Sequence, residues 1–313
     1  MRWRSSWAPA RQGRDGDVAR KPRARLVLRL IRERKLADLI APPSGAVLEA
    51  SGVFARGRSY FVVFDNLRGL ARIDRSLQPG GSHEWVGRAR SGEGYEDLTY
   101  SPYKKRYYLL VEAEKHPDGT YKSIIEELDD DFRFKGRHWV DCPFRKRNTG
   151  FEGLTAVRWK GADFLLALCE GNRCLAGRKG AKGGGGRIRV LQRRGTRWQP
   201  VARIKLPRKV KFADYSAVAV RGDQIVVISQ EDSRLWIGRL RRSDWTIKDD
   251  NGIYDFPRSK KGKRLYCTVE GISLLSANTF VVVSDLTKKA HPRRGRRKDQ
   301  SIHIFKLPRT LRK

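Results

Sequence analysis

Apolar residues along this chain come in short runs, and the same strand–turn–strand spacing of runs occurs five times. β-Branched and aromatic residues dominate the runs, and Gly, Asn or Lys occupies the turns, which is typical of β-hairpins. Continuous apolar runs such as Phe280–Val283 indicate strands that are buried on both faces. The predicted strand pairs are 51–55 with 60–64, 98–101 with 107–111, 154–159 with 164–168, 217–220 with 225–228, and 272–275 with 280–283.

Each pair is followed by further strand-like segments. The predicted third strands are 69–74, 120–128, 186–192, 234–240 and 302–307, and the predicted fourth strands are 84–88, 134–140, 198–204 and 243–248. The fifth repeat has no fourth strand before the C-terminus, and Ala24–Leu30 is the remaining candidate. Its pairing with 302–307 closes a ring and shields the sheet edges. The pattern over Val27–Ile40 also allows one short helix.

These elements predict an all-β protein, a five-bladed β-propeller with four strands per blade that is closed by an N-terminal strand. Residues 24–313 form this single domain, and residues 1–23 are expected to be a disordered basic arm. The arm is rich in Arg, Gly and Pro and lacks the apolar run of a signal peptide. No stretch of the sequence approaches the roughly 20 apolar residues that a membrane-spanning helix needs.

A polar oxygen recurs at one place in every repeat, just before or at the start of the first strand. The five residues are Ser51, Glu96, Glu152, Ser216 and Glu270, about 45 to 64 residues apart. A repeat of about this length is typical of a propeller or a solenoid. The first strand of each propeller blade lines the central channel, so we expect these five side chains to converge at one mouth.

Three carboxylates at such short range raise one another's pKa, and something must offset their charge. Ca²⁺ does so directly, since it accepts six to eight oxygen ligands in flexible geometry. The absence of thiolate and imidazole from these positions argues against zinc and copper. The alternative is a ring of acids that accepts hydrogen bonds from neighbouring backbone amides and binds no metal.

A second set of polar residues ends the second strand of each repeat: Asp65, Glu112, Glu170, Gln230 and Asp285. The two strands are antiparallel, so both sets should surround the same mouth. Acids beside Arg68 and a divalent ion are what hydrolysis by metal-activated water uses. The predicted catalytic residues are Asp65, Arg68, Glu112, Glu170 and Asp285. The alternative is that these acids cap backbone amides and pair with scattered arginines.

The order Ser, Glu, Glu, Ser, Glu across five repeats resembles the calcium-activated nucleotidase (apyrase) family over about Leu48–Leu307. The resemblance implies a five-bladed propeller with axial Ca²⁺ held by the five repeated residues. The segment Val63–Gly69 is similar to a family segment ending in Asp-Asp-Arg-Thr-Gly, but Asn66 replaces the second aspartate. The acidic N-terminal segment of the family has no counterpart, so the resemblance extends to fold and metal and not to nucleotidase activity. The Glu-Gly segments also resemble bacterial phytase-esterase-like and SdiA-regulated propellers.

The chain has 68 Lys and Arg against 34 Asp and Glu, a net charge of +34. This excess predicts binding to a polyanion or an anionic small molecule, although an arginine-rich composition alone would also produce it. The four cysteines, Cys142, Cys169, Cys174 and Cys267, form no zinc-like pattern and are expected to be reduced in a cytoplasmic protein. A Cys169–Cys174 bridge is the alternative that their spacing allows.

Three functional hypotheses remain. The first is a calcium-binding propeller with a polar site at one mouth, and the second is a metal-dependent hydrolase of phosphate or carboxylate esters. The third is a polyanion-binding or scaffold propeller. The substrate and the oligomeric state do not follow from the sequence.

Overall fold

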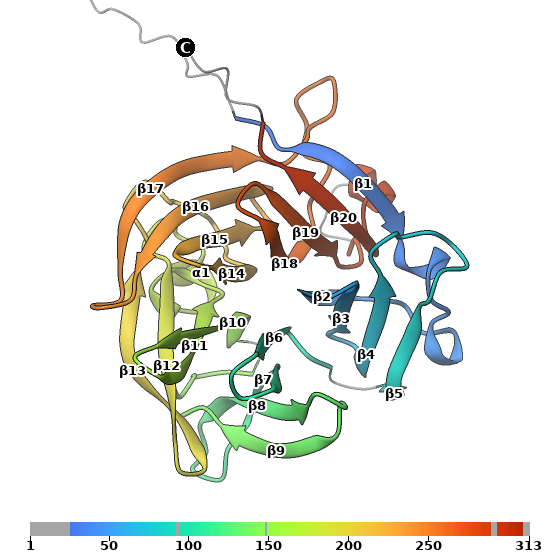
Figure 1. Cartoon of the computed structure of the whole chain (residues 1–313). Coiled ribbons are helices and arrows are strands. Elements are labelled where there is room, and N and C mark those ends of the chain that lie inside the picture. Colours follow the sequence, from blue (N-terminus) through green and yellow to red (C-terminus); the bar gives the residue numbers. More distant parts are fainter. Residues whose placement is uncertain (1–25, 92–93, 148, 289–292, 309–313) are drawn as a thin grey trace, which may run out of the picture.

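The computed structural model describes residues 26–308 except 92–93, 148 and 289–292. Five antiparallel four-stranded sheets form a ring around a central axis (Figure 1). This confirms the predicted five-bladed propeller. The expected basic arm, residues 1–23, lies outside the described residues.

The blades follow one another in chain order, each from the inner strand to the outer one. Blade 1 contains β2 (Ala50–Arg56), β3 (Ser59–Phe64), β4 (Leu67–Asp74) and β5 (Glu84–Ser91). Blade 2 contains β6 (Asp97–Ser101), β7 (Arg106–Lys115), β8 (Tyr121–Asp129) and β9 (Phe134–Trp139). Blade 3 contains β10 (Phe151–Trp159), β11 (Ala162–Cys169), β12 (Arg187–Arg194) and β13 (Arg197–Lys205). Blade 4 contains β14 (Ala217–Arg221), β15 (Gln224–Ser229), β16 (Arg234–Arg241) and β17 (Thr246–Asp255). Blade 5 contains β18 (Val269–Ser276), β19 (Thr279–Ser284), β20 (Ser301–Lys306) and β1 (Arg29–Lys35).

The N-terminal strand closes the ring as predicted, because β1 pairs antiparallel with β20 from Arg29–Lys306 to Lys35–Ser301. The predicted bounds, Ala24–Leu30, were about five residues too early. The true strand is highly charged because it forms the outer edge of the blade, so it lacks the apolar pattern of an inner strand. The helix allowed over Val27–Ile40 is wrong: the structure has β1 followed by a single 3₁₀ turn, η1 (Leu36–Asp38).

A buried polar chain locks this closing strand to its neighbours. His303 on β20 is fully buried, and its ring nitrogens contact Ser284 Oγ at 3.0 Å and Glu33 Oε2 at 3.3 Å. The hydrogen bond from His303, together with the ion pair to Lys298, lowers the pKa of Glu33 to about 2. Ser284 is only 1% exposed. This Ser–His–Glu chain is therefore part of the ring closure, not a catalytic triad open to substrate.

The fourth strand of blade 4 also differs from its prediction of 243–248. Residues 242–245 form the turn instead, and Trp245 has a φ of 55°, which no strand residue adopts. The strand then runs on to Asp255, where it pairs with Arg234. The full length of this outer strand was not predicted, because its polar residues give no apolar alternation in the sequence.

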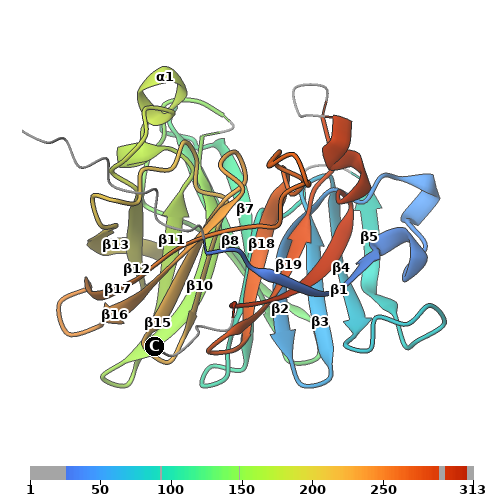
Figure 2. The same ribbon diagram turned by 90° about the horizontal axis from the view of Figure 1, so that it is seen from above.

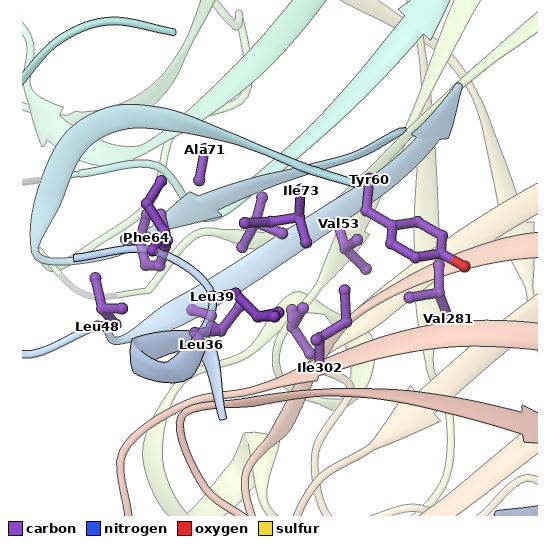
Figure 3. Packing of buried hydrophobic residues seen from close by; sticks show 14 of the residues in the cluster. Leu36, Leu39, Leu48, Val53, Tyr60, Phe64, Ala71, Ile73, Val281 and Ile302 are labelled. Atoms are coloured by element: carbon purple, nitrogen blue, oxygen red, sulfur yellow. The ribbon is translucent and has the colours of Figure 1, made fainter. Parts of the chain in front are cut away.

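The hydrophobic core is divided into clusters that lie between neighbouring blades. Figure 3 shows the cluster between blades 5 and 1, where Tyr60 and Phe64 pack with Val281 and Ile302. Leu36, in the turn after β1, is completely buried there. Burial of a leucine side chain contributes about 2 kcal/mol. The residues after β1 thus fill the joint between the first and last blades, as well as completing a sheet.

The two ends of the channel differ. The loops that follow the second strands, with η3 (Asn172–Cys174), α1 (Gly177–Gly180) and η4 (Arg293–Arg297), lie at the end where the inner strands begin, as Figure 2 shows for α1. We call this end the upper mouth; η2 (Pro43–Gly45) lies on the connection into blade 1. The lower half of the channel is a cavity of about 190 Å³ whose lining includes Leu98, Leu154 and Val218. Thr99, Thr155, Ser273 and Arg221 also line it, and none of the five repeated Ser and Glu residues does.

No helix among the described residues is both long enough and apolar enough to cross a membrane.

Candidate metal-binding mouth

Each repeated polar residue is left unpaired in the ladder between the first and second strands of its blade. Ser51, Glu152 and Glu270 are the extra residues of β-bulges. In blades 2 and 4 the ladder starts one residue later. There the amides of Glu96 and Ser216 donate to Leu110 O and Ile228 O, at 2.8 and 3.0 Å, the same residues that pair with the following positions. A bulge re-aims one side chain out of the alternation of its strand.

The glycines that follow three of these residues allow the inner strands to approach closely. A Cβ on Gly271 would lie 2.7 Å from Gly52 Cα, and a Cβ on Gly153 would lie 2.8 Å from Val218 N. No side chain fits at either position. The Glu-Gly pairs of blades 3 and 5 therefore combine an aimed carboxylate with tight packing around the axis.

Asp97 follows Glu96 where the other repeats have Gly or Ala, and it was not among the predicted site residues. It is 2% exposed, and its carboxylate accepts hydrogen bonds from Leu98 N at 2.8 Å and from Leu154 N, in the next blade, at 2.7 Å. Burial nonetheless raises the pKa of Asp97 well above its usual range. Asp97 links blades 2 and 3.

The two serines are held by the neighbouring blades. Ser51 Oγ donates to Tyr95 O, and Ser216 Oγ donates to Val269 O at 2.9 Å. Both serines are almost fully buried. Since each hydroxyl uses its proton in this bond, its oxygen lone pairs remain available to a cation.

The three glutamates form the axial cluster, Glu96, Glu152 and Glu270. Burial and the neighbouring carboxylates raise the pKa of Glu96 to about 8 and that of Glu152 and Glu270 well above the usual range. Glu96 and Glu270 both act on Glu152. Among the described residues no ion pair joins any of the three to Lys or Arg.

Another group of acids is more compact than the axial cluster. Oxygens of Glu49, Asp65 and Asp285 lie within 4.8 Å of one another, and within the described chain this is the sole set of three acids, His or Cys that meets this spacing. We call it the rim cluster. The ammonium of Lys288 lies 3.4 Å from Asp285 Oδ2 and 4.0 Å from Asp65 Oδ2. Burial raises the pKa of Asp65 to about 8 and that of Asp285 to about 6, and Lys288 opposes both shifts.

Glu49 was not predicted as a site residue, although the sequence contains a pattern that points to it. In both blades whose axial residue is Ser, an acid stands two positions earlier: Glu49 before Ser51, and Asp214 before Ser216. The three Glu blades have Gly or Thr there. Asp214 accepts hydrogen bonds from Ser229 Oγ and Glu231 N, and burial raises its pKa to about 7. The two blades that have Ser in place of Glu therefore each carry an acid two positions earlier in the chain.

The remaining predicted catalytic residues divide into two groups. The charges of Glu112 and Glu170 raise the pKa of the axial glutamates Glu96 and Glu152. Burial and nearby acids in turn raise the pKa of Glu112 and of Glu170. Arg68 instead pairs with Glu126 at 3.1 Å and with Glu114 at 3.6 Å. Its guanidinium therefore links blade 1 to blade 2.

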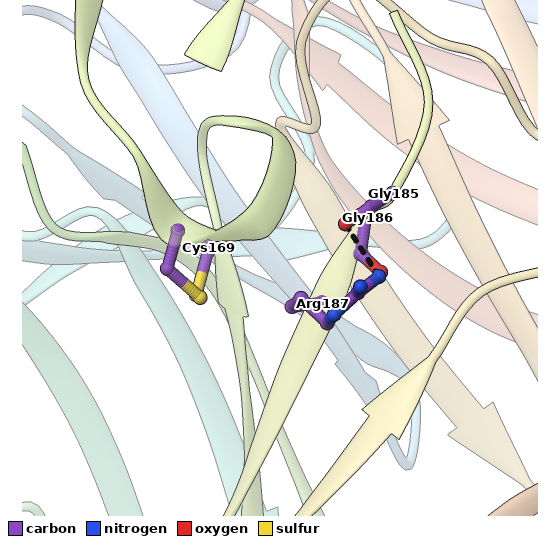
Figure 4. Close-up of a disulfide and its surroundings, with 5 residues drawn as sticks. Cys169, Gly185, Gly186 and Arg187 are labelled. Atoms are coloured by element: carbon purple, nitrogen blue, oxygen red, sulfur yellow. Dashed lines mark hydrogen bonds between the residues drawn. A yellow bond between two sulfur atoms is a disulfide. The ribbon is translucent and has the colours of Figure 1, made fainter. Parts of the chain in front are cut away.

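A disulfide stands at the mouth, between Cys169 at the end of β11 and Cys174 (Figure 4). The expectation that all four cysteines are reduced is wrong for this pair, because the strand end and the 3₁₀ turn bring the two Cα atoms to 5.1 Å; Cys142 and Cys267 are free. A disulfide is typical of an oxidising compartment, so the predicted cytoplasmic location is not confirmed. The bridge closes the loop that carries Glu170.

Comparison with known proteins yields no family: no protein-family model matches the chain, and no curated protein does either. Several solved structures are similar to it in outline. Glutaminyl cyclase from Myxococcus xanthus is 13% identical, with a TM-score of 0.49, over 91% of this chain and 98% of that one. The PQQ-bound aldose sugar dehydrogenase from Streptomyces coelicolor is 12% identical, with a TM-score of 0.48, over 92% and 100%. At these values the likeness assigns no activity.

Proposed function

We propose that this protein is a calcium-binding β-propeller that holds one Ca²⁺ at the upper mouth. The ligands would be Ser51, Glu96, Glu152, Ser216 and Glu270. The observation that carries the proposal is the convergence of three half-buried glutamates at the starts of the inner strands, close enough to raise one another's pKa and without an ion pair to Lys or Arg among the described residues.

The residues present fit this ion. All five donors are oxygens, as Ca²⁺ prefers, and the two serines already direct their protons to backbone carbonyls. The charge of the ion would offset the carboxylates and would polarise an ester bound beside it. The resemblance to the calcium-activated nucleotidase family supports the same ligand set.

Hydrolysis of a phosphate or carboxylate ester is the second candidate. Glu170 favours it, because this residue lies at the mouth and its pKa is raised by partial desolvation and by the charge of Glu231. A carboxylate with a raised pKa accepts a proton from water more readily near neutral pH. Arg68, bound to Glu114 and Glu126, would have to leave these partners to meet a substrate.

The metal content of the purified protein tests the calcium proposal. We expect one Ca²⁺ per chain after equilibrium dialysis, and none for Glu152→Gln. The matched control is Glu84→Gln, which changes an exposed glutamate on the outer strand β5 and should leave one Ca²⁺ bound. Wild-type protein without bound calcium, or a Glu152→Gln variant that retains it, would contradict the proposal.

Turnover of p-nitrophenyl phosphate and p-nitrophenyl acetate tests the second candidate. Hydrolysis should require Ca²⁺ and be lost in Glu170→Gln while calcium stays bound. A calcium-loaded protein inert toward both esters would leave the binding proposal intact and remove the hydrolase.

A further inference from the structure

The upper mouth has a side pocket of about 710 Å³, between the loop that enters blade 3 and the disulfide loop. Ligand sites for small molecules are commonly of this size. One wall comes from residues 143–147 and 149–150, and the other from residues between 169 and 179. Glu170 belongs to its lining, so the pocket opens beside the axial cluster.

The rim of this pocket is strongly basic. Arg145, Lys146, Arg147 and Lys179 line it, and all four side chains are exposed. Within the described part of the chain, no acid pairs with Arg145, Lys146 or Lys179, whereas many other basic residues of the protein are engaged in ion pairs. Glu170 is the one acid in the lining. Such a rim attracts a ligand group that carries more than one negative charge.

Part of the pocket lining is apolar. It contains Phe144, Leu175 and the Cys169–Cys174 disulfide. The Phe144 ring packs edge-on against Phe151 at a centroid distance of 5.2 Å, and Leu175 is 42% exposed. An exposed leucine beside a phenyl ring and a disulfide offers a contact surface for an apolar or aromatic group.

Both walls are held in place by contacts outside the pocket. Phe144 N donates to Tyr121 O at 2.7 Å, which ties the first wall to blade 2. In the second wall, Asn172 is 2% exposed and donates to Gly180 O and Phe212 O, both at 2.9 Å, while it accepts from Tyr215 OH at 2.7 Å. The pocket is therefore preorganised, which reduces the entropy lost on binding.

We propose that this side pocket binds an organic phosphate that carries an aromatic ring. The guanidinium and ammonium groups of the rim would hold the phosphate, and Phe144 and Leu175 would contact the ring. Arginine in particular matches phosphate oxygens with two parallel hydrogen bonds. The proposal does not depend on calcium at the axis, since none of the five axial ligands lines the pocket.

Calorimetric titration with phenylphosphonate in EDTA tests the proposal, because this probe cannot be hydrolysed and no calcium is present. We expect saturable binding of one molecule, at least tenfold tighter than methylphosphonate, which lacks the ring, and than benzoate, which carries one charge. The double variant Lys146→Gln, Lys179→Gln should weaken binding tenfold or more.

The control is Lys260→Gln, Lys261→Gln, which removes the same charge from exposed lysines outside the pocket and should change the affinity less than twofold. Leu175→Ser, an exposed position, should reduce the preference for phenylphosphonate over methylphosphonate. Absence of saturable binding would overturn the proposal. An equal loss of affinity in the two double lysine variants would also overturn it, because the probe would then be attracted by the overall charge of the protein. Equal affinity for phenylphosphonate and methylphosphonate would also overturn it.

Discussion

The axial cluster and the rim cluster are both rich in carboxylates, but they differ in what offsets their charge. The rim cluster of Glu49, Asp65 and Asp285 has the ammonium of Lys288 beside it. In the axial cluster no Lys or Arg of the described residues forms an ion pair with a glutamate, and Lys288 lowers the pKa of Glu96 and Glu270 only from beyond ion-pair distance. The pKa of Asp285 rises to about 6 and that of Asp65 to about 8, while that of Glu96 rises to about 8 and those of Glu152 and Glu270 rise well above their usual range. The rim cluster therefore has a cation supplied by the chain itself, whereas the proposal made above gives the axial cluster a cation from solution.

The largest expected effect comes from breaking the axial cluster with Glu152→Gln. At 100 times the dissociation constant, calcium should stabilise the wild type by about 2.7 kcal/mol, and this gain should vanish in the variant. In EDTA at pH 8 or above the order reverses: the variant should be more stable than the wild type, because its amide cannot ionise and so does not repel Glu96 and Glu270 as these lose their protons. Denaturant unfolding with and without calcium measures both. Equal calcium stabilisation of the two proteins would contradict the comparison.

Asp97 is a third case, a buried carboxylate that is stabilised by hydrogen bonds from backbone amides alone. Asp97→Asn places an amide NH₂ against one of the donors Leu98 N and Leu154 N. We expect a loss of about 1–3 kcal/mol, because a buried donor is left without an acceptor. Urea unfolding measures it, and the loss should be the same in calcium and in EDTA. A loss seen only in calcium would mean that Asp97 belongs to the ion site.

The pH dependence of stability should separate the two states of the axial cluster. The folded pKa of Glu96, about 8, lies above its ordinary value of 4.5, so the folded protein binds more protons than the unfolded chain between these values. In EDTA the free energy of unfolding should therefore fall, by about 3 kcal/mol from Glu96 alone, as pH rises from about 5 to 8. Saturating calcium should remove the part of this fall that comes from the axial glutamates and leave the part that comes from Asp65, Asp214 and Asp285. Melts at several pH values test it, and a rise with pH in EDTA would be the opposite result.

Lys288→Gln should have the smallest effect. The lysine side chain is 55% exposed, so its ion pairs contribute less than about 1 kcal/mol. The loss should grow as pH rises through about 6 to 8, where Asp285 and Asp65 lose their protons. Thermal melts at pH 5 and pH 8 test this against Lys260→Gln, an exposed lysine elsewhere. A loss above 2 kcal/mol would mean that the rim cluster, and not the axial one, is the uncompensated site.

The repeat pattern was sufficient to predict the ring, since strand pairs and a recurring Ser or Glu specify both the blades and their inner ends. Ring closure was predicted, but the bounds of β1 were not, because its charged edge residues carry no apolar alternation. The rim cluster was missed in part: Glu49 lies two positions before Ser51, and only the recurring Ser or Glu of each repeat was given a role. The partners of Arg68 depend on the angle between blades, which no local pattern encodes.

Thermal unfolding of the wild type in saturating calcium and in EDTA at pH 8 tests the central claim most directly. The account predicts a clearly higher melting temperature in calcium, because the ion offsets three buried carboxylates that otherwise repel one another. Magnesium at the same concentration should give a smaller shift, since Mg²⁺ demands a tighter octahedral geometry. Identical melts in calcium and EDTA would contradict an axial ion and leave the upper mouth as a ring of protonated acids.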